Sequence, residues 1–454
     1  MATPQAAAAA TQRLGESAQS AARRLRTLAG MGRSTAPTPR PTPRPTPRKG
    51  PRIGLALAGG GPLGAIYEIG ALCALEETLV GLDLNALDGY IGVSAGSFIA
   101  AGLANGISAR RMCRAFIEND RDAGFEISPT AFIHPAWGEY LQRLASVPTL
   151  VAQAGLRYAF KGRSLLSAFE RLGRALPTGV FSNAPLEAQM RRVFEVDGRS
   201  NDFRRLRRHL IIVATDLDSG ESAPFGLPGW DHVPISQAVR ASAALPGLFP
   251  PVKIGRRHYV DGALKKTLHA RVLLEQGVDL LLCLNPLVPF DATHSPQHRV
   301  LSSGDERIPH LVDGGLPVVL SQTFRSLIHS RLELGMKGYE TSHPDTDIVL
   351  FEPDQRDPEL FLANIFSYSQ RRVVAEHAYQ QTRADLRSRR STLGTVLARH
   401  GVSIDHAVLD DPSRRLVSRR LPPRTRGARA LKRLEEVLND LERALPAAPA
   451  GRHA

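Results

Sequence analysis

The chain has 454 residues, a formal net charge of +14 at pH 7 and 43% hydrophobic residues. That share of hydrophobic residues can build a sizeable core, which excludes a wholly disordered protein. Three scattered cysteines exclude a disulfide framework and show no metal-site spacing. We find no secretory signal and no apolar run of about 18 residues that would predict a membrane span, so we expect a cytoplasmic protein.

The net charge is concentrated at the two ends of the chain. Residues 1–52 carry ten basic side chains and one acidic one, and residues 413–454 carry eleven basic and four acidic ones. Residues 53–412 therefore have a net charge of only −2. A near-neutral body argues against nucleic acid as a partner. The tails predict peripheral contact with an anionic membrane surface.

Proline-rich and leucine-rich segments mark these ends. Residues 35–48 read TAPTPRPTPRPTPR and predict a semi-rigid polyproline II linker, so structure should begin near residue 50. In the last segment, leucines recur at helical spacing and predict an amphipathic helix. These leucines are Leu431, Leu434, Leu438, Leu441 and Leu445.

Strand and helix patterns alternate after the linker. Residues 53–61, IGLALAGGG, predict a buried strand that glycines close. Further predicted elements follow in chain order: a helix over 65–79, a strand over 87–94, a helix over 95–104, strands over 210–217 and 279–287, and long helices over 317–339 and 357–389. The alternation predicts an α/β fold with a mostly parallel central sheet covered on both faces.

A G-x-S-x-G motif lies where the second strand should meet its helix, at residues 92–96, GVSAG. A serine on such a turn projects its hydroxyl away from the sheet, and the sharp turn needs small neighbours, Gly92 and Gly96. The helix N-terminus adds partial positive charge, which favours the anion formed when a serine attacks a carbonyl. Ser94 is therefore a candidate nucleophile, with a purely structural glycine-rich turn as the alternative.

A glycine-rich loop, GGGPLG, follows the first strand and contains Gly59, Gly60, Gly61 and Gly64. Its backbone N–H groups can face an anion, either a dinucleotide phosphate or the oxyanion of an acyl-transfer reaction. No acidic residue lies where a ribose would need it, and Ser94 ends the second strand. This arrangement favours an oxyanion hole over a nucleotide cradle.

A third motif, Asp261-Gly262-Ala263, follows a short predicted strand over residues 258–260. In isolation, Asp-Gly is typical of a hairpin turn. Together with the other two motifs, it offers a carboxylate that could act as a general base.

The glycine-rich loop, serine turn and Asp-Gly-Ala motif, in this order, resemble the patatin-like phospholipase family. Residues 176–194, 214–221 and 238–252 look like that family's connecting blocks. The resemblance implies a three-layer α/β/α fold and a Ser–Asp dyad without histidine. It makes Ser94 the nucleophile, Asp261 the general base, and the N–H groups around Gly60 and Gly61 the oxyanion hole.

The resemblance also implies a lipid acyl ester as substrate, with no cofactor and no metal. It predicts a catalytic domain over residues 53–275 and a helical C-terminal extension over 276–412 that packs on it. The basic segments 1–52 and 413–454 would flank these two regions. One departure is Leu63, where the family usually has a basic residue; this puts head-group preference and rate in question.

Two other readings remain open. A Ser–His–Asp esterase would draw its histidine from those after Asp261, which include His269, His294, His310 and His329. A catalytically weak scaffold would bind lipid and dock through the basic tails. Residues 137–144, WGEYLQRL, would form either a lid helix or ordinary packing.

Overall fold

The computed structural model describes residues 50–120, 134–136, 140, 177–294, 310–362 and 368–417. The chain divides into two compact units, residues 1–49 and 50–454, and all described residues belong to the second. The predicted linker, the leucine repeat and, apart from Tyr140, the segment 137–144 lie outside the described residues.

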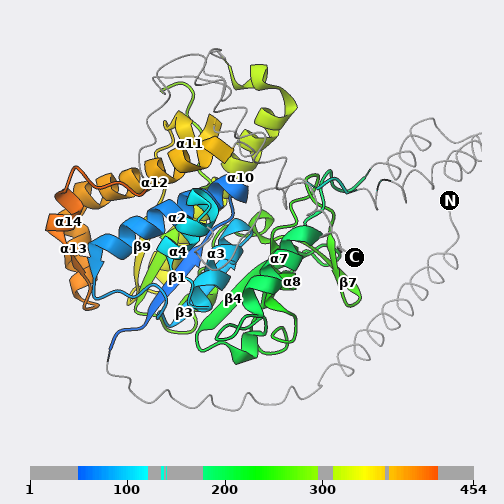
Figure 1. Ribbon diagram of the computed structural model, residues 1–454, viewed down its shortest axis with the longest axis horizontal. Coiled ribbons are helices and arrows are strands. Elements are labelled where there is room, and N and C mark those ends of the chain that lie inside the picture. The colour runs from blue at the N-terminus through cyan, green and yellow to red at the C-terminus, as the bar shows by residue number, and fades with distance from the viewer. Residues whose placement is uncertain are drawn as a thin grey trace, which may run out of the picture. The chain divides into compact units, whose positions relative to one another are not determined.

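An eight-stranded sheet forms the centre of the described structure, with the order β6-β7-β4-β3-β1-β8-β9 and β5 paired to β4 (Figure 1). Five neighbouring strands, in the spatial order β4-β3-β1-β8-β9, run parallel to one another. The other three strands, β5, β6 and β7, are antiparallel to the strands with which they pair. The strands are β1 Ile53–Leu57, β3 Gly89–Val93, β4 His209–Asp216, β5 Ser222–Phe225, β6 Val252–Ile254, β7 Arg257–Asp261, β8 Leu280–Leu284 and β9 Asp347–Phe351. A separate antiparallel pair joins β2 Leu79–Val80 to β10 Ser403–Ile404.

Alternate residues of the buried strands enter two different cores. In β1, Leu55 and Leu57 belong to one hydrophobic cluster, whereas Ala56 lies in the other. The same alternation separates Ile212 from Val213 in β4, as the two-residue period of a strand requires. A sheet that buries both faces needs a helical layer on each side.

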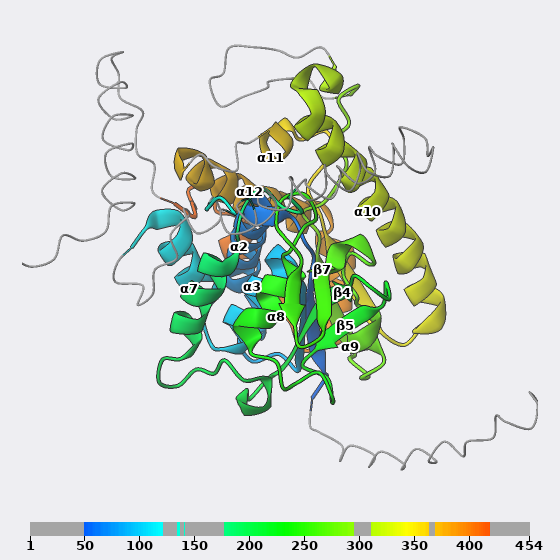
Figure 2. The same ribbon diagram turned by 90° about the vertical axis from the view of Figure 1, so that its right-hand side faces the viewer.

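Helices supply both layers, as Figure 2 shows. The first core contains residues of α2 Gly61–Thr78, α3 Ala95–Ala104, α4 Ala109–Cys113, α7 Ala184–Phe194, α8 Ile235–Ser242, α12 Tyr368–Ser388, α13 Arg390–Ala398 and α14 His406–Asp410. The second core contains residues of α9 Arg271–Leu274 and α10 Gly315–Ser342. The predicted three-layer α/β/α fold with a mostly parallel sheet is therefore confirmed.

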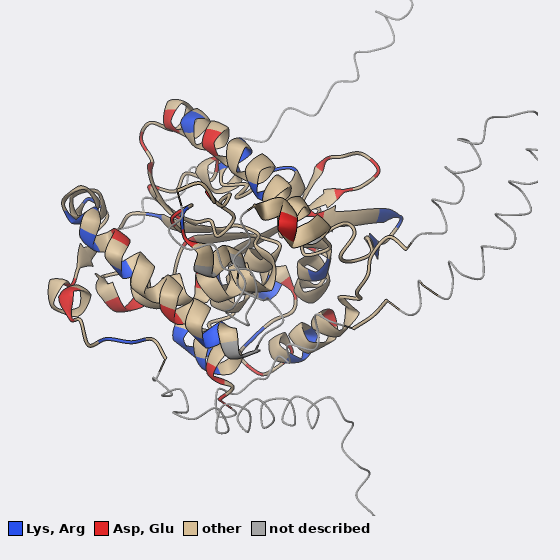
Figure 3. Ribbon diagram, turned by 90° about the horizontal axis from the view of Figure 1, so that it is seen from above, with Lys and Arg blue, Asp and Glu red and all other residues tan. Residues whose placement is uncertain are grey.

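Shorter helices complete the described chain: η1 Arg114–Glu118, η5 Phe203–Arg205, η6 Gly262–Leu264, η7 Leu311–Gly314 and α11 Pro358–Leu362. None of the described helices is both long and apolar enough to cross a bilayer. Basic and acidic residues are interspersed over the ribbon rather than separated by sign (Figure 3).

Two strands of the sheet come from the region after residue 275. β8 pairs with β1, β9 pairs with β8, and α10 lies between them in the chain. The predicted strand over 279–287 and helix over 317–339 correspond to β8 and α10. The region is thus both a helical extension, as expected, and part of the central sheet.

Candidate active site

Two strand ends meet on one edge of β4. β3 pairs with β4 as far as Val93 opposite Val213, and β7 pairs Asp261 with the next residue, Ala214. β5 pairs with β4 over residues shared with both β3 and β7, so it occupies the opposite edge. β3 and β7 therefore share one edge and run towards each other, which brings Ser94 and Asp261 together from distant parts of the chain.

Ser94 connects β3 to α3 in a strained conformation. Its φ of 52° and ψ of −121° are rare for a residue other than glycine. The Ser94 N–H donates to Ser242 Oγ at 2.8 Å, and the Ser94 carbonyl accepts from the Ser97 N–H at 3.0 Å. These contacts fix the turn, in which Ser94 is 6% exposed.

The glycines on either side of Ser94 are required by close packing. A Cβ on Gly92 would lie 2.5 Å from Ser97 Cα, and a Cβ on Gly96 would lie 2.5 Å from the Ala58 carbonyl oxygen. The Gly96 N–H donates to that same Ala58 oxygen at 3.1 Å. The turn is therefore packed tightly against the end of β1.

Asp261 is 3% exposed, and its carboxyl group accepts a hydrogen bond from the Ala263 N–H at 2.9 Å and interacts with the Ser94 side chain, which lowers its pKa. Its backbone is also fixed, because its N–H donates to the Ala244 carbonyl at 3.0 Å. Burial raises the pKa of Asp261 to about 6, although these two interactions act in the opposite direction. At neutral pH the carboxyl is mostly ionised and is a stronger base than an exposed aspartate. Gly262 packs beside Val93.

The glycine-rich loop lies against both Ser94 and the Asp-Gly-Ala motif. A Cβ on Gly59 would lie 3.0 Å from Ser94 Cβ and 3.2 Å from Ala263 Cβ. Gly61 has a φ of +59° and begins α2, whose N-terminus has no side-chain cap. Among the described residues, the N–H groups of Gly60 and Gly61 have no acceptor. Three motifs from distant parts of the chain thus surround one point, with two N–H groups available for an anion.

The loop also packs on the segment that follows β8. Gly60 and Gly64 pack on Pro286, which a Cβ on either would approach to 2.8 and 3.0 Å. Leu63 is buried in the first core. The position that differs from the family pattern is therefore occupied by a core residue here.

Among the described residues, none of the four candidate histidines has a hydrogen bond or ion pair with the Ser94 or Asp261 side chain. His269 Nε2 lies 3.4 Å from the Gly262 carbonyl oxygen, and burial lowers the pKa of His269 to about 4. His294 contacts Asp291, the His310 N–H donates to Asp313, and His329 Nε2 contacts Gln355. Within the described ranges no group of three or more His, Cys, Asp or Glu could hold a metal ion.

Ser242 is a residue that the sequence analysis did not single out. It accepts from the Ser94 N–H, and its hydroxyl donates to the Val213 carbonyl at 2.6 Å. It therefore ties the serine turn to β4. Its only sequence signal is its place in block 238–252, AVRASAALPGLFPPV.

Replacing Ser242 by alanine should loosen the serine turn. The Ser94 N–H would lose its acceptor in a buried site, which typically costs about 1–3 kcal/mol. We expect a lower free energy of unfolding, measured by urea denaturation, and a kcat reduced about 10- to 100-fold. A variant with wild-type kcat would show that Ser242 has no positioning role. Ser219→Ala, at an exposed turn, is the matched control.

A family comparison identifies the fold around this site. Residues 55–274 match the family model described as Patatin-like phospholipase. These residues form a patatin-like phospholipase domain. The domain contains the three motifs and places the protein generally among lipid hydrolases.

Solved structures resemble the chain at low identity. VipD from Legionella pneumophila is 15% identical with a TM-score of 0.35, over 75% of this chain and 67% of that one. The type III effector protein ExoU is 15% identical with a TM-score of 0.27, over 75% and 53%. ExoU in complex with SpcU, from Pseudomonas aeruginosa, is 16% identical with a TM-score of 0.24, over 64% and 53%. This chain thus spans about half the length of the ExoU structures.

Proposed function

We propose that the protein hydrolyses acyl ester bonds of lipids, as a phospholipase A or esterase, with Ser94 as nucleophile and Asp261 as general base. The observation that carries the proposal is the meeting of the Ser94 turn and the Asp-Gly-Ala motif at one edge of β4, beside the glycine-rich loop, where Ser94 lowers the pKa of the buried Asp261 carboxyl. The glycine-rich loop beside Ser94 supports it, because two N–H groups there lack an acceptor among the described residues.

In the first half of the reaction, Asp261 takes the Ser94 proton as Oγ attacks the ester carbonyl carbon. The carbonyl π-electrons move to oxygen, and the Gly60 and Gly61 N–H groups donate to this oxyanion, each worth roughly 2.7–4 kcal/mol in comparable sites. The tetrahedral intermediate then collapses, the C–O bond to the alcohol breaks, and Asp261 returns the proton to the leaving alcohol. The products are an acyl-serine and a free alcohol, for example a lysophospholipid.

In the second half, water replaces the alcohol. Asp261 takes a proton from the water molecule as the water oxygen attacks the acyl carbon. The same N–H groups stabilise the second oxyanion. Collapse releases the fatty acid, and the proton returns to Ser94 Oγ. The carboxylate with a raised pKa accepts this proton more readily than an exposed aspartate, and with a pKa of about 6 it still releases the proton near neutral pH.

The basic segments 1–52 and 413–454 would hold the enzyme at an anionic lipid surface. The near-neutral body, with charges of both signs interspersed, supports assigning this role to the tails (Figure 3). Flotation with anionic vesicles measures this membrane binding, by comparing the full chain with a chain that lacks residues 1–50.

The pH dependence and the products test the proposed chemistry together. The proton acceptor must be ionised, so kcat/KM should rise with pH through an apparent pKa of about 6 and then level off. Mass spectrometry of a phosphatidylcholine digest, without added calcium, should show fatty acid and lysophospholipid. Diacylglycerol or phosphatidic acid as the first product would contradict ester cleavage. A folded protein inactive across a lipid panel would favour the scaffold.

A further inference from the structure

His269 follows the Asp-Gly-Ala motif in a backbone conformation that is uncommon outside glycine. Its φ is 49°, and in the described part of the chain Ser94, Asn119 and His269 are the residues other than glycine with a positive φ. Strained residues of this kind persist where the surrounding structure holds them, and they cluster at active sites. Ser94 is the proposed nucleophile, and the contacts of His269 show what its own conformation achieves.

The turn that contains His269 is held on both sides. Leu268 and Ala270 are buried in the second core, and the imidazole of His269 is itself buried. The Thr267 hydroxyl donates to the Ile328 carbonyl of α10 at 3.0 Å. The His269 ring therefore has a defined place inside the protein.

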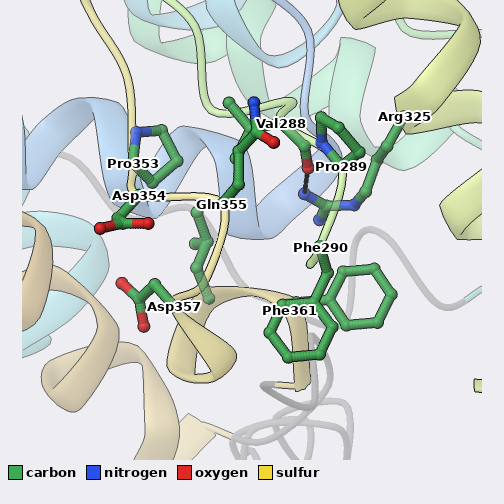
Figure 4. Close-up of a pocket in the computed structure, with 10 residues that line it drawn as sticks. Val288, Pro289, Phe290, Arg325, Pro353, Asp354, Gln355, Asp357 and Phe361 are labelled. Atoms are coloured by element: carbon green, nitrogen blue, oxygen red, sulfur yellow. Dashed lines mark hydrogen bonds between the residues drawn. The ribbon is translucent and has the colours of Figure 1, made fainter. Parts of the chain in front are cut away.

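Helix α10, which receives this hydrogen bond, is fixed to two other segments. Its Arg325 Nη1 donates to the Val288 carbonyl at 3.2 Å, in the segment after β8 (Figure 4). Further along the helix, Arg331 Nη1 donates to the Leu264 carbonyl at 2.5 Å. The segment after the Asp-Gly-Ala motif is thus tied to α10 at two points.

The His269 ring contacts the peptide group between Gly262 and Ala263. Its Nε2 lies 3.4 Å from the Gly262 carbonyl oxygen, a long hydrogen bond. A carbonyl oxygen only accepts, so Nε2 carries the proton and donates it. The same oxygen accepts from the Lys265 N–H at 3.1 Å and from the Lys266 N–H at 3.3 Å. Three donors therefore converge on one carbonyl.

The other end of the same peptide group faces the proposed base. The Ala263 N–H donates to Asp261 Oδ1 at 2.9 Å, and this hydrogen bond lowers the pKa of Asp261 against the larger effect of burial. Hydrogen bonds arranged in a chain polarise one another, so donors at the Gly262 oxygen make the Ala263 N–H a stronger donor. The effect of the His269 ring thus reaches the Asp261 carboxyl through one peptide plane.

The charged groups near His269 favour its neutral form. Burial lowers the pKa of His269 to about 4, and Lys266 and Lys265 act in the same direction. From α10, Arg331 adds a further positive charge to this segment. A histidine with this pKa is neutral wherever Asp261, with a pKa of about 6, changes its charge. The ring therefore donates the same hydrogen bond throughout the titration of the base.

We propose that His269 is a positioning residue for ester hydrolysis: its Nε2–H holds the Gly262–Ala263 peptide, which in turn orients the Asp261 carboxyl and strengthens the hydrogen bond that this carboxyl accepts. The role differs from that of a triad histidine, because the ring donates to a backbone carbonyl and transfers no proton. The inference rests on the proposed function, since it concerns the base of the same reaction.

Replacing His269 by asparagine removes the contact, because asparagine tolerates a positive φ but is too short to reach the Gly262 carbonyl. We expect kcat to fall about 10-fold at unchanged KM, and the apparent pKa of kcat/KM to rise by about 0.5 as the Ala263 N–H becomes a weaker donor. His269→Gln can again donate to the carbonyl and should recover most of kcat and the wild-type pH profile. His258→Asn, at an exposed side chain of β7, is the matched control and should change nothing.

Three results of these assays would overturn the proposal. One is a folded His269→Asn protein with wild-type kcat and pH profile, and another is a loss of kcat that glutamine does not repair and that leaves the pH profile unchanged. The third is a loss of more than about 10⁴-fold in both variants, which would make His269 the base of a Ser–His–Asp triad. An inactive wild-type protein would instead contradict the proposed function, so the two failures are distinguishable.

The protonation state of the ring gives a test that needs neither activity nor a variant of His269. In NMR spectra of the full chain labelled with ¹⁵N-histidine, Asp261→Asn should displace the signals of one ring, since the peptide links Asp261 to His269. At neutral pH that ring should be uncharged, with its proton on Nε2. No displaced ring, or a displaced ring that carries its proton on Nδ1, would overturn the proposal.

Discussion

Replacing Ser94 by alanine should reduce kcat for lipid ester hydrolysis roughly 10⁴- to 10⁶-fold, as loss of a nucleophile does in other serine hydrolases. The change removes only the hydroxyl, which lowers the pKa of Asp261. The turn contacts made by the Ser94 backbone with Ser242 and Ser97 are retained, so the fold should remain. Fatty acid release measured by titration, with thermal melting to confirm folding, checks both expectations.

Ser219→Ala provides the matched control for this experiment, since Ser219 is an exposed serine in a turn. It should hydrolyse lipid at the wild-type rate. If Ser94→Ala retained more than about a tenth of wild-type kcat, a group other than Ser94 would be the nucleophile.

Replacing Asp261 by asparagine should strongly reduce activity and should stabilise the protein above pH 6. Asparagine can still accept from the Ala263 N–H but cannot accept the Ser94 proton, so we expect kcat to fall roughly 10²- to 10⁴-fold. Burial raises the pKa of Asp261 to about 6, above its unfolded value near 3.9. The folded state therefore binds this proton more tightly, and stability is lost as pH rises between these values.

The size of the stability change follows from the same shift. A pKa raised by about two units lowers the free energy of unfolding of the wild-type protein by about 3 kcal/mol above pH 6. The variant with the neutral asparagine does not have this loss. Urea denaturation should show Asp261→Asn to be more stable than wild type at pH 8 and no more stable than wild type at pH 4. Asp218→Asn, at an exposed carboxylate, should alter neither activity nor stability. Equal wild-type and Asp261→Asn stability at pH 8 would show that burial of the ionised Asp261 carboxylate does not destabilise the folded protein.

Much of the fold could be predicted from sequence because its signals are local. The apolar run before Gly59 predicts a buried strand, and the helix predicted over 95–104 is observed as α3 with the same bounds. Helix α2 begins at Gly61, before the predicted residue 65, because glycine and proline are both accepted in a first helical turn. The helix predicted over 357–389 is described as α11 and α12, with residues 363–367 outside the described ranges.

The rest depends on contacts between distant segments. The approach of β7 to β3 along one edge of β4 results from strand register, which no local pattern encodes. Ser242 likewise acquires its place only when α8 packs on the sheet. The three motifs can be found in the sequence, but the residue that holds the Ser94 turn cannot.

Labelling with a fluorophosphonate, followed by peptide mass spectrometry, tests the central claim most directly. The probe reacts with an activated serine, so the wild-type protein should carry one adduct on the peptide containing Ser94. The adduct should be absent from Ser94→Ala and formed much more slowly in Asp261→Asn. An adduct on another residue, or none on a folded wild-type protein, would contradict the proposed Ser94–Asp261 site.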